Sequence, residues 1–165
     1  MSMIGEYLRV TPAELDRALR DPGWALDLVD GLRDAEEDSE PPAGARLFST
    51  YKTWDLLRFL LARTGFPVNV IQGEEVLCES EDWGYGPPGY LRPERVRLAA
   101  RLLRALPYDG LIDGVDPAGP AEAELYPWGR GGSVDLDWAR PWYDGMTRFF
   151  ESAAEADDAV LVWLD

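Results

Sequence analysis

The sequence predicts a single α+β domain, and three observations lead to this prediction. The chain has 165 residues, close to the usual length of one domain. Hydrophobic residues make up 46% of it, enough to build a packed core. Apolar runs of strand length lie near both ends, with segments of helical periodicity between them. We therefore expect one domain over residues 1–165, in which a small mixed sheet includes the N- and C-terminal strands and packs with about five helices.

The first strand is expected at residues 4–10 and leads directly into a helix. Thr11 is a capping residue, Pro12 takes the first helical position, and Glu14 completes a capping box. A second helix begins after Asp21, which is also a favoured capping residue. The expected inner face of this second helix comprises Trp24, Leu28 and Leu32, with Ala25 and Val29 beside them.

In the middle of the chain the sequence predicts a loop, then a helix, then an irregular stretch. Residues 34–44 combine acidic side chains with two prolines, and we expect a mobile acidic loop there. Apolar residues recur at helical spacing over residues 50–64, which predicts a third helix. Residues 66–78 show no clear period, and only 76–77 are expected to form a short strand.

The last third of the chain begins with a fourth helix at Pro93, which ends before Pro107. The Gly- and Asp-rich residues 108–120 predict one short helical turn, and 124–126 a brief strand. The final helix is expected over residues 137–155. Residues 159–164 form an unbroken apolar run, typical of a strand covered on both faces.

Charge and composition exclude several functions. The net charge of −15 disfavours binding to nucleic acid or to an anionic membrane surface. The sequence contains no histidine, which excludes His-based catalysis and His-ligated metals. A single cysteine, Cys78, is compatible with a reducing cytoplasm. We expect a cytoplasmic protein without metal or cofactor, a monomer or weak homo-oligomer, whose partner is a small molecule or a protein.

One motif imitates a dinucleotide-binding fingerprint. Residues 84–89 read Gly-Tyr-Gly-Pro-Pro-Gly, but two of these positions are prolines without a backbone N–H for phosphate. The segment Trp83–Tyr90 is instead interpreted as a rigid loop with aromatic side chains, which either covers an edge of the core or lines a pocket.

The candidate ligand-binding site combines this loop with the start of the predicted third helix. Lys52 and Asp55 are spaced to form a surface ion pair, or alternatively Lys52 reaches the loop or a ligand. The candidate residues are Lys52, Trp54, Asp55, Trp83, Tyr85, Tyr90, Tyr126 and Trp128.

Several segments in order along the chain resemble the YfbM-like family. They include Thr11-Pro12 after the first strand, Tyr51–Trp54, Ile71–Glu74, the Gly-Tyr-Gly-Pro box and Tyr126-Pro127. The resemblance implies a small bacterial cytosolic α+β protein and supplies no reaction. Two departures concern the box: Gly89 stands where the family tends to have arginine, and Arg92 where it tends to have serine or threonine.

Three functional hypotheses follow. We favour a noncatalytic binding or interaction module with an aromatic site around the Gly-Tyr-Gly-Pro loop. One alternative is an acidic, immunity-type inhibitor of a basic toxin, since the negative charge would speed association. The other is a carboxylate hydrolase that acts on carbohydrate without histidine, because so many acids place some pairs at suitable separations.

Overall fold

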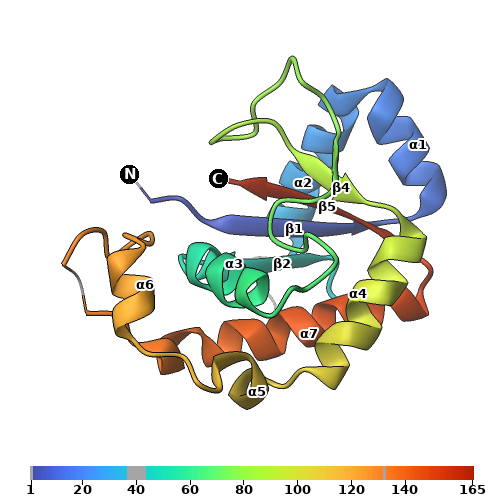
Figure 1. Cartoon of the computed structure of the whole chain (residues 1–165). Coiled ribbons are helices and arrows are strands. Elements are labelled where there is room, and N and C mark those ends of the chain that lie inside the picture. Colours follow the sequence, from blue (N-terminus) through green and yellow to red (C-terminus); the bar gives the residue numbers. More distant parts are fainter. Residues whose placement is uncertain (1, 37–43, 132) are drawn as a thin grey trace.

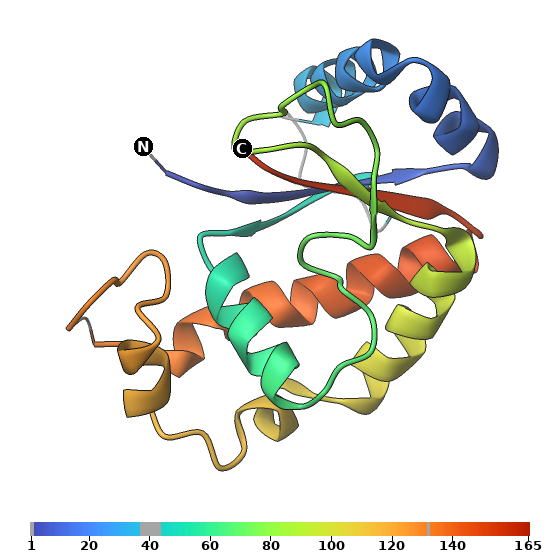
Figure 2. The same cartoon turned by 45° about the horizontal axis from the view of Figure 1, so that its top comes forward.

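A computed structural model describes residues 2–36, 44–131 and 133–165. In this part of the chain the strands form one five-stranded sheet with the order β2-β1-β5-β4-β3. Helices cover both faces, so the molecule has three layers, best seen in Figures 1 and 2. The predicted α+β class is confirmed. Every strand pair is antiparallel, so the sheet is not mixed.

The two terminal strands pair with each other at the centre of the sheet. Six residue pairs join β1 to β5, from Gly5 opposite Leu164 to Val10 opposite Ala159. β5 is buried almost throughout, as its apolar sequence predicts. The strands are β1 (Gly5–Val10), β2 (Leu47–Tyr51), β3 (Glu75–Val76), β4 (Gly89–Leu91) and β5 (Ala159–Leu164).

Two helices, α1 (Pro12–Arg20) and α2 (Pro22–Glu36), cover one face of the sheet. The capping box at Thr11 forms as predicted: its hydroxyl accepts from the backbone N–H of Glu14, whose carboxylate accepts from that of Thr11. The expected inner face of α2 does pack against the sheet, and its most buried positions are those of the smaller residues. Ala25 and Val29 are the buried residues, because small side chains let the helix approach the sheet. The larger Trp24, Leu28 and Leu32 lie half-buried beside them.

The other face carries the larger core, in which Tyr7, Leu57 and Phe150 are fully buried. A 3-10 turn at Leu136–Ala139 precedes α7, and α6 lies at the side of the molecule in Figure 1. The remaining helices are α3 (Trp54–Arg63), α4 (Pro93–Ala105), α5 (Tyr108–Ile112), α6 (Ala118–Glu122) and α7 (Arg140–Glu155).

Three local predictions were wrong. Residues 47–51 form strand β2 and the third helix begins only at Trp54, because pairing with β1 outweighs the helical spacing of the apolar residues. Residues 89–91 form strand β4, although they follow a Gly- and Pro-rich stretch. Residues 124–126 form a turn and not a strand. The predicted acidic loop over 34–44 is helical up to Glu36, and its residues 37–43 lie outside the described ones.

Candidate functional site

The sheet separates the eight residues predicted to form one site. Trp83 and Tyr90 belong to the core between the sheet and α1 and α2. Trp54 belongs to the core on the opposite face, and Tyr126 and Trp128 pack against it. The reason is that Tyr90 lies in β4, so its side chain points to one face and its neighbour Leu91 to the other. A single pocket shared by all eight residues is therefore absent, and a ligand-binding role for them stays a prediction.

Around α3 the candidate residues bind one another and the chain's first residues. The rings of Trp54 and Tyr126 stack with centroids 5.7 Å apart. The indole Nε1–H of Trp54 donates to the carbonyl of Met3 (3.1 Å), and the Met3 backbone N–H donates to the Tyr126 hydroxyl (2.9 Å). Asp55 accepts from the backbone N–H of Tyr126 at 2.9 Å. Asp55 forms its ion pair with Arg58 and not with Lys52. The polar groups of this cluster thus bond to one another, and a structural role accounts for them without a ligand.

The aromatic loop covers an edge of the core. Trp83 is only 4% exposed and meets Trp163 edge-on, with centroids 5.3 Å apart. The backbone N–H of Tyr85 donates to the carbonyl of Leu164 at 2.9 Å, which ties the loop to the end of β5. Tyr85 itself is 39% exposed. The correction to the predicted pocket is plain: the indole of Trp83 faces inward and offers no open surface.

The remaining candidates, Lys52 and Trp128, also contact aromatic neighbours. The Lys52 ammonium lies over the ring of Tyr51, 5.3 Å from its centroid, in the turn before α3. Trp128 meets Trp138 edge-on at 5.3 Å. Neither residue contacts the aromatic loop through a hydrogen bond or ion pair that the described residues contain.

Both departures from the family pattern have structural explanations. A Cβ at position 89 would lie 2.4 Å from the carbonyl oxygen of Gln72, so this packing admits only glycine. Arg92 makes two hydrogen bonds to Glu75 and one to the Tyr90 hydroxyl, and so links β3, β4 and the start of α4. Arg92 supplies no cap for α4, as its side chain predicts.

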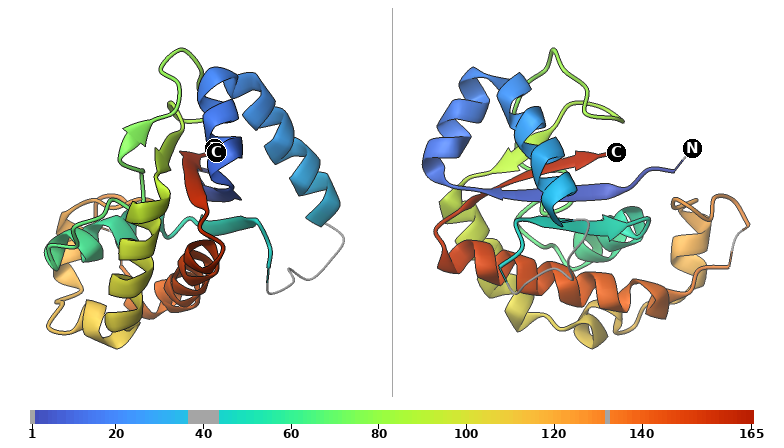
Figure 3. Two further views of the ribbon diagram at one scale, coloured as in Figure 1. Left: turned by 90° about the vertical axis from the view of Figure 1, so that its right-hand side faces the viewer. Right: turned by 180° about the vertical axis from the view of Figure 1, so that it is seen from behind.

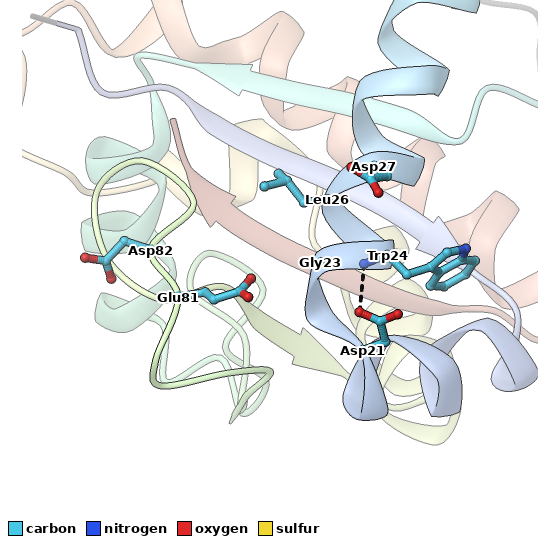
Figure 4. A pocket seen from close by; sticks show the side chains of 7 residues that line it. All are labelled: Asp21, Gly23, Trp24, Leu26, Asp27, Glu81 and Asp82. Atoms are coloured by element: carbon cyan, nitrogen blue, oxygen red, sulfur yellow. Dashed lines mark hydrogen bonds between the residues drawn. The ribbon is translucent and has the colours of Figure 1, made fainter.

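An acidic cleft of about 720 Å³ separates the start of α2 from the segment before the aromatic loop. Figure 4 shows Glu81 pointing across it toward α2, while Asp21 caps the helix by accepting from the Trp24 N–H at 3.1 Å. Within the described residues, no group of three or more metal-ligating side chains is arranged to hold a cation. The cleft is lined by Asp21, Gly23, Trp24, Leu26, Asp27, Glu81 and Asp82.

A more apolar groove of about 840 Å³ lies between the edge strand β2 and helix α7. The two elements run side by side in Figures 1 and 3. The rings of Phe48 and Phe149 stack at its floor with centroids 5.3 Å apart. At one end, Trp142 lies against Tyr51 at 5.6 Å. We call this cavity the β2–α7 groove; its lining is Ala45, Leu47, Phe48, Ser49, Trp142, Gly145, Arg148, Phe149, Glu151, Ser152 and Glu155.

The local sequence explains the floor of the groove. Phe48 lies opposite Tyr7 in the register of β1 and β2, so both rings point toward α7. Gly145 leaves room for the Phe48 ring, since a Cβ there would come within 2.9 Å of the Phe48 Cε2. Sequence reasoning missed this site because it assigned residues 50–64 to a helix. The β-favouring residues Phe48, Thr50 and Tyr51 were the signal that could have revealed it.

Charged side chains are concentrated at one end of the β2–α7 groove. Glu151 and Glu155 lie in the last turns of α7, where the helix dipole is also negative. In the described part of the chain, neither carboxylate forms an ion pair, and neither does Arg148. Arg148 also lines the groove, one helical turn before Glu151, but among the described residues neither glutamate has an ion-pair partner.

Two carboxyl groups elsewhere have raised pKa values. Burial raises the pKa of Glu6 to about 7, an effect that Arg33 opposes and Asp165 reinforces. Burial also raises the pKa of Asp158, although the Arg9 guanidinium lies 3.2 Å away and lowers it. Neither Glu6 nor Asp158 lines the groove or the cleft. No helix among the described residues is long and apolar enough to cross a membrane.

The comparisons with known proteins agree with this fold. The structure is similar to the crystal structure of YfbM from Escherichia coli, a protein of unknown function, with a TM-score of 0.57 and 17% sequence identity. The match covers 99% of this chain and 100% of that one. None of the curated proteins matches the sequence. The model of the family described as a domain of unknown function (DUF1877) matches residues 1–163. The resemblance to YfbM-like proteins is thus confirmed, and the chain belongs to the DUF1877 family.

Proposed function

We propose that the protein is a noncatalytic binding module that holds an extended segment of a partner protein along the open edge of β2. The observation that supports this most directly is that three consecutive residues, Leu47–Ser49, line the β2–α7 groove. Consecutive side chains of a strand point to opposite faces. A groove that touches all three therefore runs along the hydrogen-bonding edge of the strand.

An open strand edge is a natural docking surface. Among the described residues β2 is the end strand of the sheet, so every second residue directs its backbone N–H and C=O away from β1. A partner strand would satisfy these groups, and its alternate side chains would rest on the aromatic floor of Phe48 and Phe149. The volume of about 840 Å³ is within the range of common ligand sites.

The charge of the protein favours a basic partner. The net charge of −15 attracts cationic segments and repels nucleic acid and anionic lipid. We place the protein in the cytoplasm, as a monomer or weak homo-oligomer, where its single Cys78 would stay reduced. An acidic inhibitor of a basic toxin is a special case of this function, supported by the net charge and the acidic cleft.

The hydrolase hypothesis gains no support from the geometry. The carboxyl groups with raised pKa values, Glu6 and Asp158, lie away from the groove and the cleft. A general acid needs a raised pKa and a place beside the substrate. Glu6 and Asp158 have the first property and lack the second.

The test is a titration of the full ¹⁵N-labelled chain with an acetylated and amidated peptide of alternating valine and lysine. We expect amide shifts at Leu47–Ser49 and along the facing side of α7. Ser152→Trp, which fills the groove, should weaken binding at least tenfold. Asp144→Trp puts the same indole on an exposed position of α7 outside the groove and should bind normally. Absence of shifts at β2, or equal binding by both variants, would overturn the proposal.

A further inference from the structure

The two ends of the β2–α7 groove are chemically different because of how β2 lies against α7. The Phe48 ring packs on Phe149 and lies over Gly145. The Tyr51 ring, further along β2, packs on Trp142. Moving forward along β2 therefore means moving backward along α7. The segment from Ala45 to Tyr51 and the helix from Glu155 to Trp142 each span about 20 Å, since a strand rises roughly 3.3 Å per residue and a helix 1.5 Å.

The end of the groove at Tyr51 is aromatic and carries a positive charge. Trp142 and Tyr51 lie at 31° to each other with centroids 5.6 Å apart. Tyr51 is 37% exposed, and the Lys52 ammonium covers its ring at 5.3 Å. Such a surface favours an apolar or aromatic side chain and disfavours a second cation.

The opposite end of the groove, at Ala45 and Leu47, is acidic. Glu151 and Glu155 line it and are one helical turn apart, so they lie on the same side of α7. The backbone carbonyls at the C-terminal end of α7 add partial negative charge. Arg148 also lines the groove, but its guanidinium lies near Gly145 and, among the described side chains, forms no ion pair with either glutamate. A guanidinium or ammonium group is the chemistry that complements this end.

We infer that the groove selects its partner by the order of side chains along the bound segment. The segment has about six residues, pairs antiparallel to β2, begins with an apolar or aromatic side chain and ends with an arginine or lysine. This inference rests on the proposed function. Antiparallel pairing matches every other strand pair of the sheet. It places the start of the segment beside Tyr51 and Trp142 and its end beside Glu151 and Glu155.

Two peptides of identical composition test the inference: acetyl-Phe-Thr-Val-Thr-Val-Arg-amide and its reverse, acetyl-Arg-Val-Thr-Val-Thr-Phe-amide. Their dissociation constants are measured by amide shifts of the full ¹⁵N-labelled chain at low salt. We expect the first peptide to bind at least fivefold more tightly. The preference should shrink with added salt, because it depends on partly exposed charges.

Variants that neutralise carboxylates test whether the preference for the first peptide depends on Glu151 and Glu155. The double variant Glu151→Gln/Glu155→Gln should abolish it. The variant Asp30→Asn/Asp34→Asn removes the same charge from exposed positions on α2 that line neither the groove nor the cleft, and should keep it. Both variants retain the buried side of their helices, and their circular dichroism spectra confirm folding.

The outcomes distinguish this inference from the proposed function. If both peptides shift β2 with equal affinity, or the reversed one binds more tightly, the inference fails and the binding module stands. If neither peptide shifts β2, the proposed function fails with it. A stable dimer in sedimentation velocity that Ser152→Trp dissociates would assign the groove to a second copy and overturn the inference.

Discussion

The ring of Phe48 lies directly over Gly145, so that a Cβ on this glycine would come within 2.9 Å of the Phe48 Cε2. The contact brings β2 and α7 close together and forms the floor of the β2–α7 groove. Glycine inside a helix normally costs about 1 kcal/mol relative to alanine. The space that Phe48 requires explains why the position tolerates this cost.

Gly145→Ala should therefore fail to give the usual stabilisation. Its helix propensity gain of about 1 kcal/mol is opposed by overpacking against Phe48, which typically costs about 1–3 kcal/mol. Gly31→Ala in α2 is the matched control, since a Cβ there meets nothing within 4 Å. Urea denaturation should show Gly31→Ala as more stable than Gly145→Ala by at least about 1 kcal/mol. Equal gains in both variants would contradict the contact.

Trp83→Ala and Tyr85→Ala should behave very differently although they lie two residues apart. Trp83 is 4% exposed and packs on Trp163, so its truncation should cost about 3–5 kcal/mol. Tyr85 is 39% exposed, and its backbone carries its hydrogen bond to Leu164, so its truncation should cost less than about 0.5 kcal/mol. Thermal and urea unfolding measure both values. Similar costs for the two variants would show that the indole is not buried as described.

Asp55→Ala should destabilise the protein by about 1–2 kcal/mol, because it leaves the partly buried backbone N–H of Tyr126 without its acceptor. Lys52→Ala should change the unfolding free energy by less than about 0.5 kcal/mol, since its ammonium contacts only an exposed ring. Comparing these two variants distinguishes the observed Asp55–Tyr126 hydrogen bond from the Lys52–Asp55 ion pair that the sequence spacing suggested. A large loss in Lys52→Ala would favour the ion pair instead.

Glu6 should make stability fall as pH rises. Its pKa is raised from 4.5 to about 7 in the folded protein, mainly by burial. Between these values the folded state holds a proton that the unfolded state has lost, so the stabilising contribution is complete below pH 4.5 and disappears as pH passes 7. Glu6→Gln should therefore be more stable than the parent at pH 8 and nearly equal to it at pH 4.5.

Urea denaturation of the parent and the variant across this pH range measures the effect. Glu122→Gln, at an exposed position on α6, controls for the change in net charge. If Glu6→Gln follows the parent at every pH, or gains stability only in acid, the assignment of the pH dependence to Glu6 is wrong.

The sequence predicts those parts of the fold that local interactions determine. The capping box at Thr11, the start of α4 at Pro93 and the apolar strand β5 are all confirmed, since each is specified by neighbouring residues. β2 was missed because its partner β1 lies far away in the chain. β4 pairs with the nearby β3 over only two residues, and its other partner, β5, is distant in the sequence. Local preferences carry no information about such partners.

The candidate site was less predictable than the fold. The sequence indicates that Trp54 and Trp83 are large aromatic residues suited to a core or a pocket. Which face of the sheet each one covers depends on where β4 joins the sheet. The groove at Phe48 and Phe149 joins residues about a hundred positions apart. Such a relationship requires the register of β1 and β2, which no local pattern specifies.

The central position of β5 has a consequence for how the chain is made. The strand order puts β5 between β1–β2 and β4–β3, so these two strand pairs join the same sheet only through it. Because β5 follows the other four strands in the sequence, a nascent chain holds two unconnected halves until residues 159–164 leave the ribosome exit tunnel. Assembly of the complete sheet thus waits for residues 159–164, and its speed is limited by closing the long loop between β1 and β5.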